Sequence, residues 1–332
     1  MSTKIKWALF FLILVAGISV WFLTDDKKSE KSSNPYHFAV KDTSAITRIF
    51  MTDRSGTRIN LIRQPSHWVL NNTYPARQNA IDNLMDAIRR VELKFIPPGV
   101  ALDHITKDLA THGIKVVIYG KGDHILKGYY VGGVTPDERG TYMIMEGSEK
   151  PAVTYIPGWE GGLRARYWMH PVDWRDRTVL GFSFDEIKEV TVQYPEQAGE
   201  SFHLGKTGKG IEVRPLFRSA KSQDQGEVPG AGEAYLMGFR NLGAEAIVEN
   251  QNLIDSLRGM KPFAMISVLT ENSEVRTIEI FPYEEAGSGY QRPSERYYAL
   301  SNWGDLYLIQ DRIFRRILRG YSYFTLPGTT DN

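Results

Sequence analysis

The chain has 332 residues, 42% of them hydrophobic and 24% charged, which is enough for about two globular domains of ordinary size. Its 40 basic and 39 acidic residues leave a net charge of only +1, so the protein has no overall attraction for nucleic acid. The absence of cysteine excludes disulfides, thiolate metal ligands and cysteine nucleophiles. We therefore expect no nucleic-acid partner and none of these chemistries.

An apolar segment near the N-terminus predicts a membrane anchor. Residues 7–23 are interrupted only by one Gly and one Ser, and they come after Lys4 and Lys6. As a helix this segment would extend about 26 Å, which just crosses a bilayer. A cleaved signal peptide is the alternative, but the run is longer than a usual signal-peptide core and lacks an Ala-x-Ala site before its end. We favour an uncleaved anchor, with the cytoplasmic tail and transmembrane helix together forming residues 1–23.

A short tail and an anchor that precede a large region are typical of a signal-anchor that exports the globular part of the chain. We therefore expect a single-pass inner-membrane protein whose globular part lies in the periplasm. Residues 24–36, which begin TDDKKSEKSSNP, are polar and charged and predict a flexible tether.

Beyond the tether, short strand-like segments occur in two series of similar order. In the first lobe, residues 37–167, alternating apolar residues predict an antiparallel meander, then a helix around residues 81–91, then four strands. In the second lobe, residues 183–326, FDEIKEVTVQ begins a similar series, and LIDSLRGM is interpreted as the matching helix. Three residue pairs align the copies: Ile46 with Ile187, Ile81 with Ile254, and Tyr142 with Tyr297.

On this alignment the second copy gains a loop and loses a segment. The gained loop, residues 219–233, is rich in Gly, Ser, Gln and Pro and predicts mobility, while the lost segment surrounds LDHITKDLATHG. Identity between the copies is low, so a chance alternation of strands is the alternative to duplication, which we favour. The predicted fold class is α+β, with an N-terminal transmembrane helix and two similar lobes, each a mostly antiparallel sheet with one or two helices. Residues 327–332 form a tail.

Several segments carry a resemblance to a known family. Together with the anchor, they resemble the bacterial family called domain of unknown function 4340. The segments are ITRI followed by WVL, then HGIKVVIYG, YYVGGVTPDERGTYMI and WRDRTVLGFSFDEIKEVTV. The likeness covers nearly all of residues 40–320, although THGIKV stands where the family more typically has a Tyr-Gly-Leu run. The resemblance implies a membrane-anchored envelope protein, sometimes encoded with or fused to gliding-type ABC transporter components. No activity is established for the family, so no functional residue is carried over from it.

Motifs for catalysis and metal binding are weak. In GESFHLGKTGKG, residues 199–210, five residues stand where a P-loop needs four and a strand-like segment comes next, so we interpret it as a hairpin turn. His104, Asp108 and His112 would share a helix face, but no second cluster completes a zinc site, and a solvated helix is favoured. The sequence has no Gly-x-Ser-x-Gly elbow. We therefore predict no catalytic residue, metal ligand or cofactor.

The segment DRIFRRILRGYSYF, residues 311–324, predicts an amphipathic terminal helix that docks its apolar side on the second sheet. The alternative is that its arginines contact anionic lipid or an acidic partner. These arginines are Arg312, Arg315, Arg316 and Arg319.

The dense stretch WMHPVDWRDRTVLGF, residues 168–182, lies between the two predicted lobes, and we interpret it as their connection. Its bulky residues are expected to bury at an inter-lobe joint, and its charged residues to pair across it or cap a turn. The predicted joint residues are Trp168, Trp174, Arg175, Asp176, Arg177 and Phe182.

These expectations favour a membrane-anchored extracytoplasmic binding or scaffold protein, an accessory subunit of a bacterial envelope assembly for transport, secretion or motility. Its expected partners are the membrane, through the N-terminal helix, and an envelope protein such as an ABC transporter or a secretion or motility complex. The alternative is an envelope hydrolase acting on glycan or peptide. A shallow apolar or aromatic groove would support binding, whereas convergent carboxylates or a His-based pair in a deep pocket would support the hydrolase.

Overall fold

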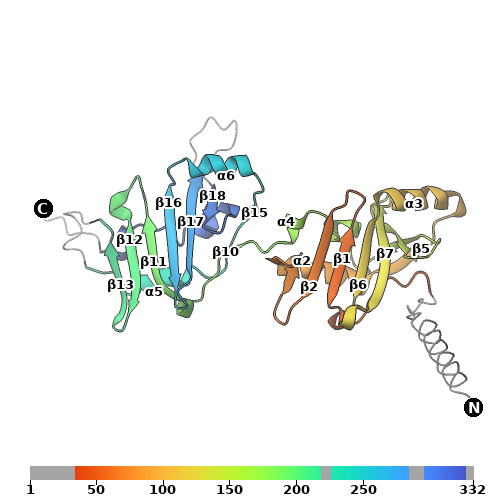
Figure 1. Ribbon diagram of the computed structural model, residues 1–332, viewed down its shortest axis with the longest axis horizontal. Helices are drawn as coiled ribbons and strands as arrows, with labels where there is room; N and C mark the ends of the chain where they lie inside the picture. Colours follow the sequence, from red (N-terminus) through yellow and green to blue (C-terminus); the bar gives the residue numbers. More distant parts are fainter. Residues whose placement is uncertain (1–33, 218–225, 284–294, 327–332) are drawn as a thin grey trace, which may run out of the picture. The chain divides into compact units, whose positions relative to one another are not determined.

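The computed structural model describes residues 34–217, 226–283 and 295–326 of a chain that divides into two compact units (Figure 1). Unit 1 ends at Asp176 and unit 2 begins at Arg177, so the boundary falls inside the connection predicted for residues 168–182. The predicted anchor, residues 7–23, lies outside the described residues. Among the helices that the structure describes, none is both long enough and apolar enough to cross a membrane.

Unit 1 is built on one nine-stranded antiparallel sheet in the order β4-β3-β2-β1-β6-β7-β8-β9-β5 (Figure 1). The strands are β1 (Arg48–Thr52), β2 (Arg58–Arg63), β3 (Trp68–Leu70), β4 (Tyr74–Pro75), β5 (Glu92–Phe95), β6 (Ile114–Tyr119), β7 (Ile125–Val134), β8 (Thr141–Met145) and β9 (Ala152–Tyr155). The α-helices are α2 (Gln78–Arg90), α3 (Gly99–His112) and the single turn α4 (Pro171–Trp174). Short 3-10 turns are η1 (Thr43–Ala45), η2 (Lys121–Asp123) and η3 (Arg164–Arg166).

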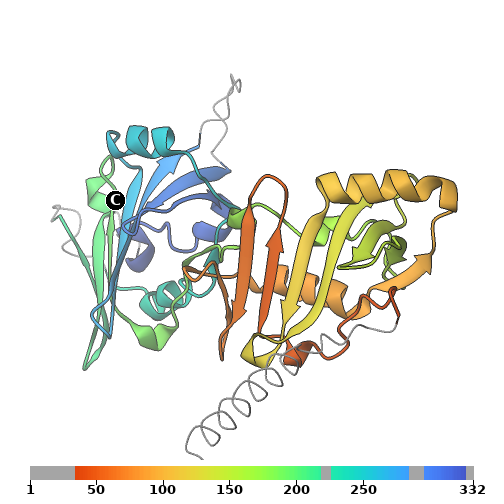
Figure 2. The same cartoon turned by 45° about the vertical axis from the view of Figure 1, so that its right-hand side comes forward.

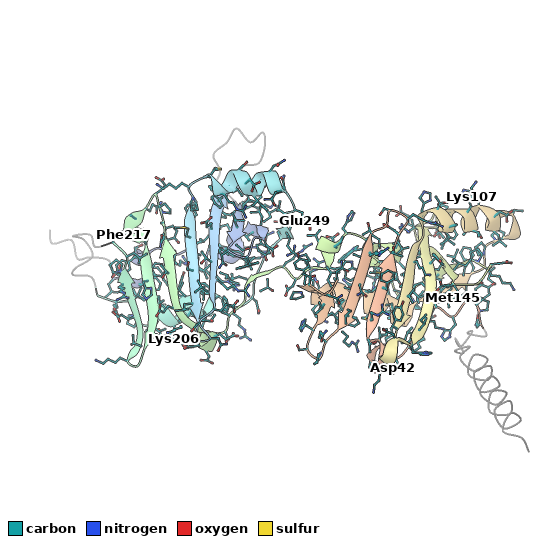
Figure 3. The ribbon with its side chains drawn as sticks, viewed as in Figure 1. Asp42, Lys107, Met145, Lys206, Phe217 and Glu249 are labelled. Carbon is teal, nitrogen blue, oxygen red and sulfur yellow. The ribbon has the colours of Figure 1, made fainter. Side chains whose placement is uncertain are left out.

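One helix packs on each face of this sheet (Figure 2). α2 buries Ile81 and Leu84 in the main core of the unit, together with Tyr129 of β7. α3 buries Leu109 in a second cluster that includes Tyr130 of the same strand. Because neighbouring side chains of a strand point to opposite faces, α2 and α3 lie on opposite sides of the sheet. Lys107, labelled in Figure 3, lies on the exposed side of α3.

Gly113 ends α3 at a place where any other residue would collide with the helix. Its N–H donates to the Leu109 carbonyl at 2.9 Å, and a Cβ at position 113 would lie only 2.2 Å from that oxygen. Since the obstacle is backbone, we expect Gly113→Ala to lower the free energy of unfolding by about 1–3 kcal/mol. Gly99→Ala is the control, because a Cβ there meets no atom within 4 Å. Denaturant titration of both variants measures the difference, and equal losses would contradict the prediction.

Two buried phenols make unit 1 sensitive to alkaline pH. The hydroxyls of Tyr129 and Tyr167 lie 3.1 Å apart in the core, and burial raises the pKa of Tyr167 from 10.0 to about 12 and that of Tyr129 well above its usual value. The folded state binds the two hydroxyl protons more tightly than the unfolded chain does. Their contribution to the free energy of unfolding is therefore complete below pH 10 and is lost as the pH rises towards 12. We expect a loss on the order of 2 kcal/mol from Tyr167 alone. Chemical unfolding at a series of alkaline pH values, together with tyrosinate absorbance, measures this loss. In Tyr167→Phe the free energy of unfolding should fall less steeply as the pH rises. An equally steep fall in this variant would show that Tyr167 is not responsible.

Unit 2 is built on an eight-stranded antiparallel sheet in the order β13-β12-β11-β16-β17-β18-β19-β15. These strands are β11 (Ile187–Gln193), β12 (Phe202–Thr207), β13 (Gly210–Pro215), β15 (Ala246–Ile247), β16 (Ala264–Thr270), β17 (Val275–Pro282), β18 (Arg296–Ser301) and β19 (Leu306–Gln310). A separate pair joins β10 (Thr178–Leu180) to β14 (Leu242–Gly243). The helices are α5 (Ala231–Met237), α6 (Gln251–Arg258) and α7 (Asp311–Phe314), with 3-10 turns η4 (Phe184–Glu186), η5 (Ala198–Glu200) and η7 (Tyr321–Phe324).

The two sheets have the same strand order once β4 is set aside. In unit 1, Ile49 pairs with Leu61 on one side and Ile118 on the other; in unit 2, Val190 occupies the same position between Leu204 and Val268. Ile49 and Val190 are 141 residues apart, as are Ile46 and Ile187. The expected α+β class with mostly antiparallel sheets is therefore confirmed, and the first of the three predicted alignments agrees with the register.

The predicted helix correspondence is wrong. α6 contains Ile254 and lies between β15 and β16, which is the place that α3 takes between β5 and β6. The counterpart of α2, which contains Ile81, is α5, and the segment predicted to be lost is replaced by α6. Tyr142 packs on α3 and Tyr298 packs on α6, so Tyr298 and not Tyr297 is its counterpart. Apolar spacing identifies a helix but does not distinguish one amphipathic helix from another.

The predicted terminal helix over residues 311–324 is also wrong in its length. α7 ends at Phe314, and the backbone of Gly320 is extended (φ −86°, ψ 170°) before the turn η7. Phe314 and Ile317 are buried, as expected for docking on the second unit. Glycine is a poor helix former, and burial of these two side chains is achieved by one helical turn and a loop.

Candidate interaction groove beside the edge strand β13

β13 is the end strand of the unit 2 sheet, and a two-residue turn, Gly208–Lys209, joins it to β12. Gly210 comes directly after this turn with φ +128°, a backbone conformation that favours glycine. The hairpin predicted from GESFHLGKTGKG is therefore confirmed. Figure 3 labels Lys206, which lies near the turn on β12.

The open side of β13 presents backbone hydrogen-bonding groups. In a hairpin with a two-residue turn, the closing residues, here Thr207 and Gly210, exchange backbone hydrogen bonds. Bonded and non-bonded pairs then alternate along the strands, so the N–H and C=O groups of Ile211 and Val213 point away from β12. Within the described ranges, neither residue has a backbone hydrogen bond on that side. Two positions of this edge are therefore open to pairing with a further strand.

A cavity of about 400 Å³, here called the edge groove, lies beside this open strand. Its lining comes from β13, from the start of α5 and the segment that leads into it, and from η7. The apolar and aromatic lining residues are Ile211, Val213, Val228, Pro229, Ala231, Tyr321 and Phe324, and the charged ones are Lys209, Glu227 and Glu233. The groove therefore combines an unpaired strand edge with an apolar wall and charges of both signs.

Close packing holds the walls of the edge groove. A Cβ on Gly232 of α5 would lie 2.7 Å from Cγ2 of Ile211, so glycine lets the helix approach β13 closely. On the other wall, the N–H of Val228 donates to the Phe324 carbonyl at 2.9 Å, next to a bridge between Glu227 and Thr325. The groove is thus bounded by a helix on one side and a short antiparallel pairing on the other.

Aromatic packing fixes Phe324 at the base of this wall. Its ring centroid lies 4.8 Å from that of Phe202 and 5.3 Å from that of Tyr235. The Tyr235 hydroxyl donates to the Ile317 carbonyl at 2.9 Å, and burial raises the pKa of this hydroxyl well above its usual value. A neutral, hydrogen-bonded Tyr235 therefore supports the wall over the physiological pH range.

His203 is the residue most relevant to the hydrolase alternative, because it has both a hydroxyl and a carboxylate as neighbours. Its Nδ1 lies 3.1 Å from Thr191 Oγ1, and its Nε2 lies 4.0 Å from Glu189 Oε2. His203 is paired with Arg214, whereas Ile211 and Val213 of the groove point to the opposite face of β13. This set therefore lies on the other side of the sheet from the groove, and it supplies no chemistry to it.

The predicted joint residues are divided between the units. Trp174 is fully buried in the core of unit 1, where its Nε1 donates to the Trp168 carbonyl at 2.9 Å. Arg175 stacks on Tyr74, with its guanidinium carbon 3.9 Å from the ring centroid. The Asp176 N–H donates to the Pro75 carbonyl at 2.8 Å, again within unit 1.

Arg177 and Phe182 belong to unit 2. Nη1 of Arg177 donates to the Glu245 carbonyl at 2.6 Å, and the Phe182 N–H donates to the Phe239 carbonyl at 3.3 Å. Each of these contacts lies within one unit, and a role for the joint residues in holding the units together stays a prediction.

The four arginines of residues 312–319 are exposed. Arg316 donates to the carbonyls of Arg240 and Asn241, at 3.0 and 3.2 Å, and Arg319 lies over the Tyr323 ring at 5.1 Å. Arg312 donates to the Gln310 side chain at 3.5 Å. The contact of Arg312, Arg315, Arg316 and Arg319 with lipid or a partner stays a prediction.

His104, Asp108 and His112 lie on α3, as the spacing predicts, and Nδ1 of His112 is 2.9 Å from an Asp108 carboxylate oxygen. In the part of the chain that the structure describes, no group of three His, Cys, Asp or Glu residues is arranged to hold a metal ion.

Sequence reasoning identified β13 as a strand but not as a sheet edge, and it placed the start of α5 in a mobile loop. The one available signal was Glu-Ala-Tyr-Leu-Met, residues 233–237, in which Glu, Ala, Leu and Met favour a helix. Whether a strand lies at the edge of a sheet depends on its pairing with distant segments of the chain. Local sequence patterns do not show this pairing.

Comparison with known proteins gives one match. The sequence model of a family described as domain of unknown function (DUF4340) matches residues 68–257, more than half of the chain. No curated protein and no solved structure matches significantly. The matched range begins at β3 of unit 1 and ends in α6 of unit 2, so it includes β13 and α5.

Proposed function

This chain belongs to the family described as domain of unknown function (DUF4340), and from that premise we propose that it is a membrane-tethered, extracytoplasmic binding protein. Its partner supplies an extended segment that pairs with β13 in the edge groove. As an accessory or scaffold subunit, it serves a bacterial envelope assembly for transport, secretion or motility.

The observation that carries this proposal is the open edge of β13 beside an apolar groove. Strand addition to a sheet edge uses backbone hydrogen bonds for affinity and neighbouring pockets for alternate side chains. Ile211 and Val213 offer the backbone groups, and Val228 and Phe324 contribute to the apolar wall. The backbone groups along one side of the groove are those of a strand edge, which suit an extended peptide segment.

The N-terminal sequence supports an extracytoplasmic location of the partner. Residues 7–23 are long enough to anchor the chain, and the polar residues 24–33 separate them from unit 1. The proposal therefore places the groove in the periplasm and limits its partners to envelope proteins. Alkaline carbonate extraction of membranes tests the anchor: the full chain should stay in the pellet.

Site-specific photocrosslinking in intact cells tests the groove. A photoreactive residue at Lys209, which lines the groove, should form a covalent adduct with an envelope protein. The matched control is the same residue at Glu271, an exposed position on the turn between β16 and β17. Adducts of the same identity and yield at both positions would overturn the proposal. Combining the Lys209 probe with Val213→Pro, which removes a backbone donor from the edge, separates specific pairing from chance capture.

A further inference from the structure

A second exposed apolar surface lies in unit 1, where β5 leads into α3. Its residues, here called the apolar turn, are Leu93, Phe95, Ile96 and Val100, which are 37%, 46%, 52% and 96% exposed. Single exposed apolar side chains are ordinary, whereas several that gather together are typical of contact sites. These four fall within eight consecutive residues, 93–100. Figure 2 shows β5, the orange arrow at the right of unit 1, with α3 above it.

The backbone of β5 is protected against strand addition, unlike that of β13. The pairing of β5 with β9 shifts between Leu93 and Phe95, so Lys94 forms a bulge. Its ammonium group donates to the Arg139 carbonyl at 2.9 Å and lies 3.6 Å from the Asp137 carboxylate. A hydrogen bond from the Thr135 hydroxyl, with smaller effects from the Arg139 N–H and Lys94, lowers the pKa of Asp137, which therefore stays charged. Bulges and charged side chains are the means by which natural edges avoid pairing.

What β5 and α3 present is therefore side-chain surface rather than a strand edge. β5 ends at Phe95, Pro97 and Pro98 follow after Ile96, and α3 begins at Gly99 with Val100 in its first turn. Four side chains fall well short of the surface of about 800 Å² per partner that a stable protein complex needs. A contact of this size suffices only if the two surfaces are already held close to each other.

The tether supplies this proximity to the bilayer. The described chain begins at Asn34 and is fixed at once, because Phe38 is buried and the Val40 N–H donates to the Ile88 carbonyl at 3.0 Å. Lys41 then lies 4.0 Å from Glu92, the first residue of β5. Ten residues, 24–33, separate the predicted anchor from Asn34, and they span at most about 35 Å when fully extended. The start of β5 thus lies beside Lys41, seven residues after the first described residue, Asn34.

We propose that the apolar turn, Leu93, Phe95, Ile96 and Val100, inserts into the lipid interface of the membrane that holds the anchor. This inference rests on the anchored state in the proposed function, but it uses a surface of unit 1 that is separate from the edge groove. Apolar side chains at the level of the lipid headgroups gain free energy by leaving water, and the tether makes the contact intramolecular. Unit 1 is thereby given one preferred face towards the bilayer.

The absence of cysteine allows a direct test on the full chain in vesicles of phosphatidylethanolamine and phosphatidylglycerol. Val100→Cys is labelled with a polarity-sensitive fluorophore, and Ser66→Cys, on the exposed turn between β2 and β3, is the matched control. Quenching by lipids that carry a nitroxide on the acyl chain should be several-fold stronger at position 100 than at position 66. Adding Phe95→Ser and Ile96→Ser to the labelled Val100→Cys chain should reduce the quenching to the control level.

Equal quenching at positions 100 and 66, in a chain that stays with the vesicles after alkaline carbonate, would overturn the lipid contact and leave the anchor in place. A probe at position 100 that is shielded in cells but not quenched by lipid would identify a protein partner instead, which also overturns it. Loss of the chain from the vesicles would refute the anchor itself, and the lipid contact with it.

Discussion

Trp174→Ala is expected to lower the free energy of unfolding of unit 1 by roughly 3–5 kcal/mol. The Trp174 side chain is fully buried, its indole N–H donates to the Trp168 carbonyl, and its ring lies 5.6 Å from the Trp168 ring. Its own carbonyl accepts the Arg77 N–H at 2.7 Å, next to the start of α2. Truncation leaves a cavity in the core and an unpaired carbonyl on Trp168, and both effects destabilise the same unit.

Denaturant unfolding of the full chain measures this loss, and Trp159→Ala is the control. Trp159 is 50% exposed and stacks on Arg166 at 4.4 Å, so its removal should cost less than about 1 kcal/mol. Hydrogen exchange then locates the effect: amides of unit 1 should lose protection while those of unit 2 keep it. Similar losses in the two variants would contradict the assignment, and lost protection in unit 2 would show that Trp174 also couples the units.

Val213→Pro is expected to reduce partner capture at Lys209 by about fivefold while leaving the fold intact, since one hydrogen bond contributes on the order of 1 kcal/mol. The N–H that this substitution removes points away from β12, so the existing ladder loses no bond. A partner strand in the edge groove would lose that donor, and the proline ring would block its approach. The crosslink yield at Lys209 is the measurement.

Two further variants separate binding from stability. Val213→Thr keeps both the N–H and a β-branched side chain, so capture should be unchanged. Glu212→Pro removes an N–H that points into the β12 ladder, so it should destabilise unit 2 by on the order of 1–3 kcal/mol. Undiminished capture in Val213→Pro, with unit 2 folded, would show that the partner does not pair with β13.

Local sequence patterns identified most of the long strands and the helices α2 and α3. Alternating apolar residues mark one face of a strand. Local sequence alone therefore predicts β11, β12, β16 and β17. β5 was missed because all four of its residues are exposed and show no alternation. α5 was missed because it begins within a stretch rich in Gly and Pro.

Unlike the individual strands and helices, the two candidate interaction surfaces could be located only in the tertiary structure. The amino-acid sequence alone established that residues 210–215 form a strand after a glycine turn, that residues 7–23 are apolar enough to span a bilayer, and that the chain resembles the family whose sequence model matches residues 68–257. The three-dimensional fold was needed to show that β13 ends its sheet, that α5 and η7 enclose a groove beside it, and that a bulge at Lys94 interrupts the edge strand β5. The reason is that the spacing of apolar residues shows which face of a segment is buried. Whether a strand lies at a sheet edge depends instead on which distant segments pair with it.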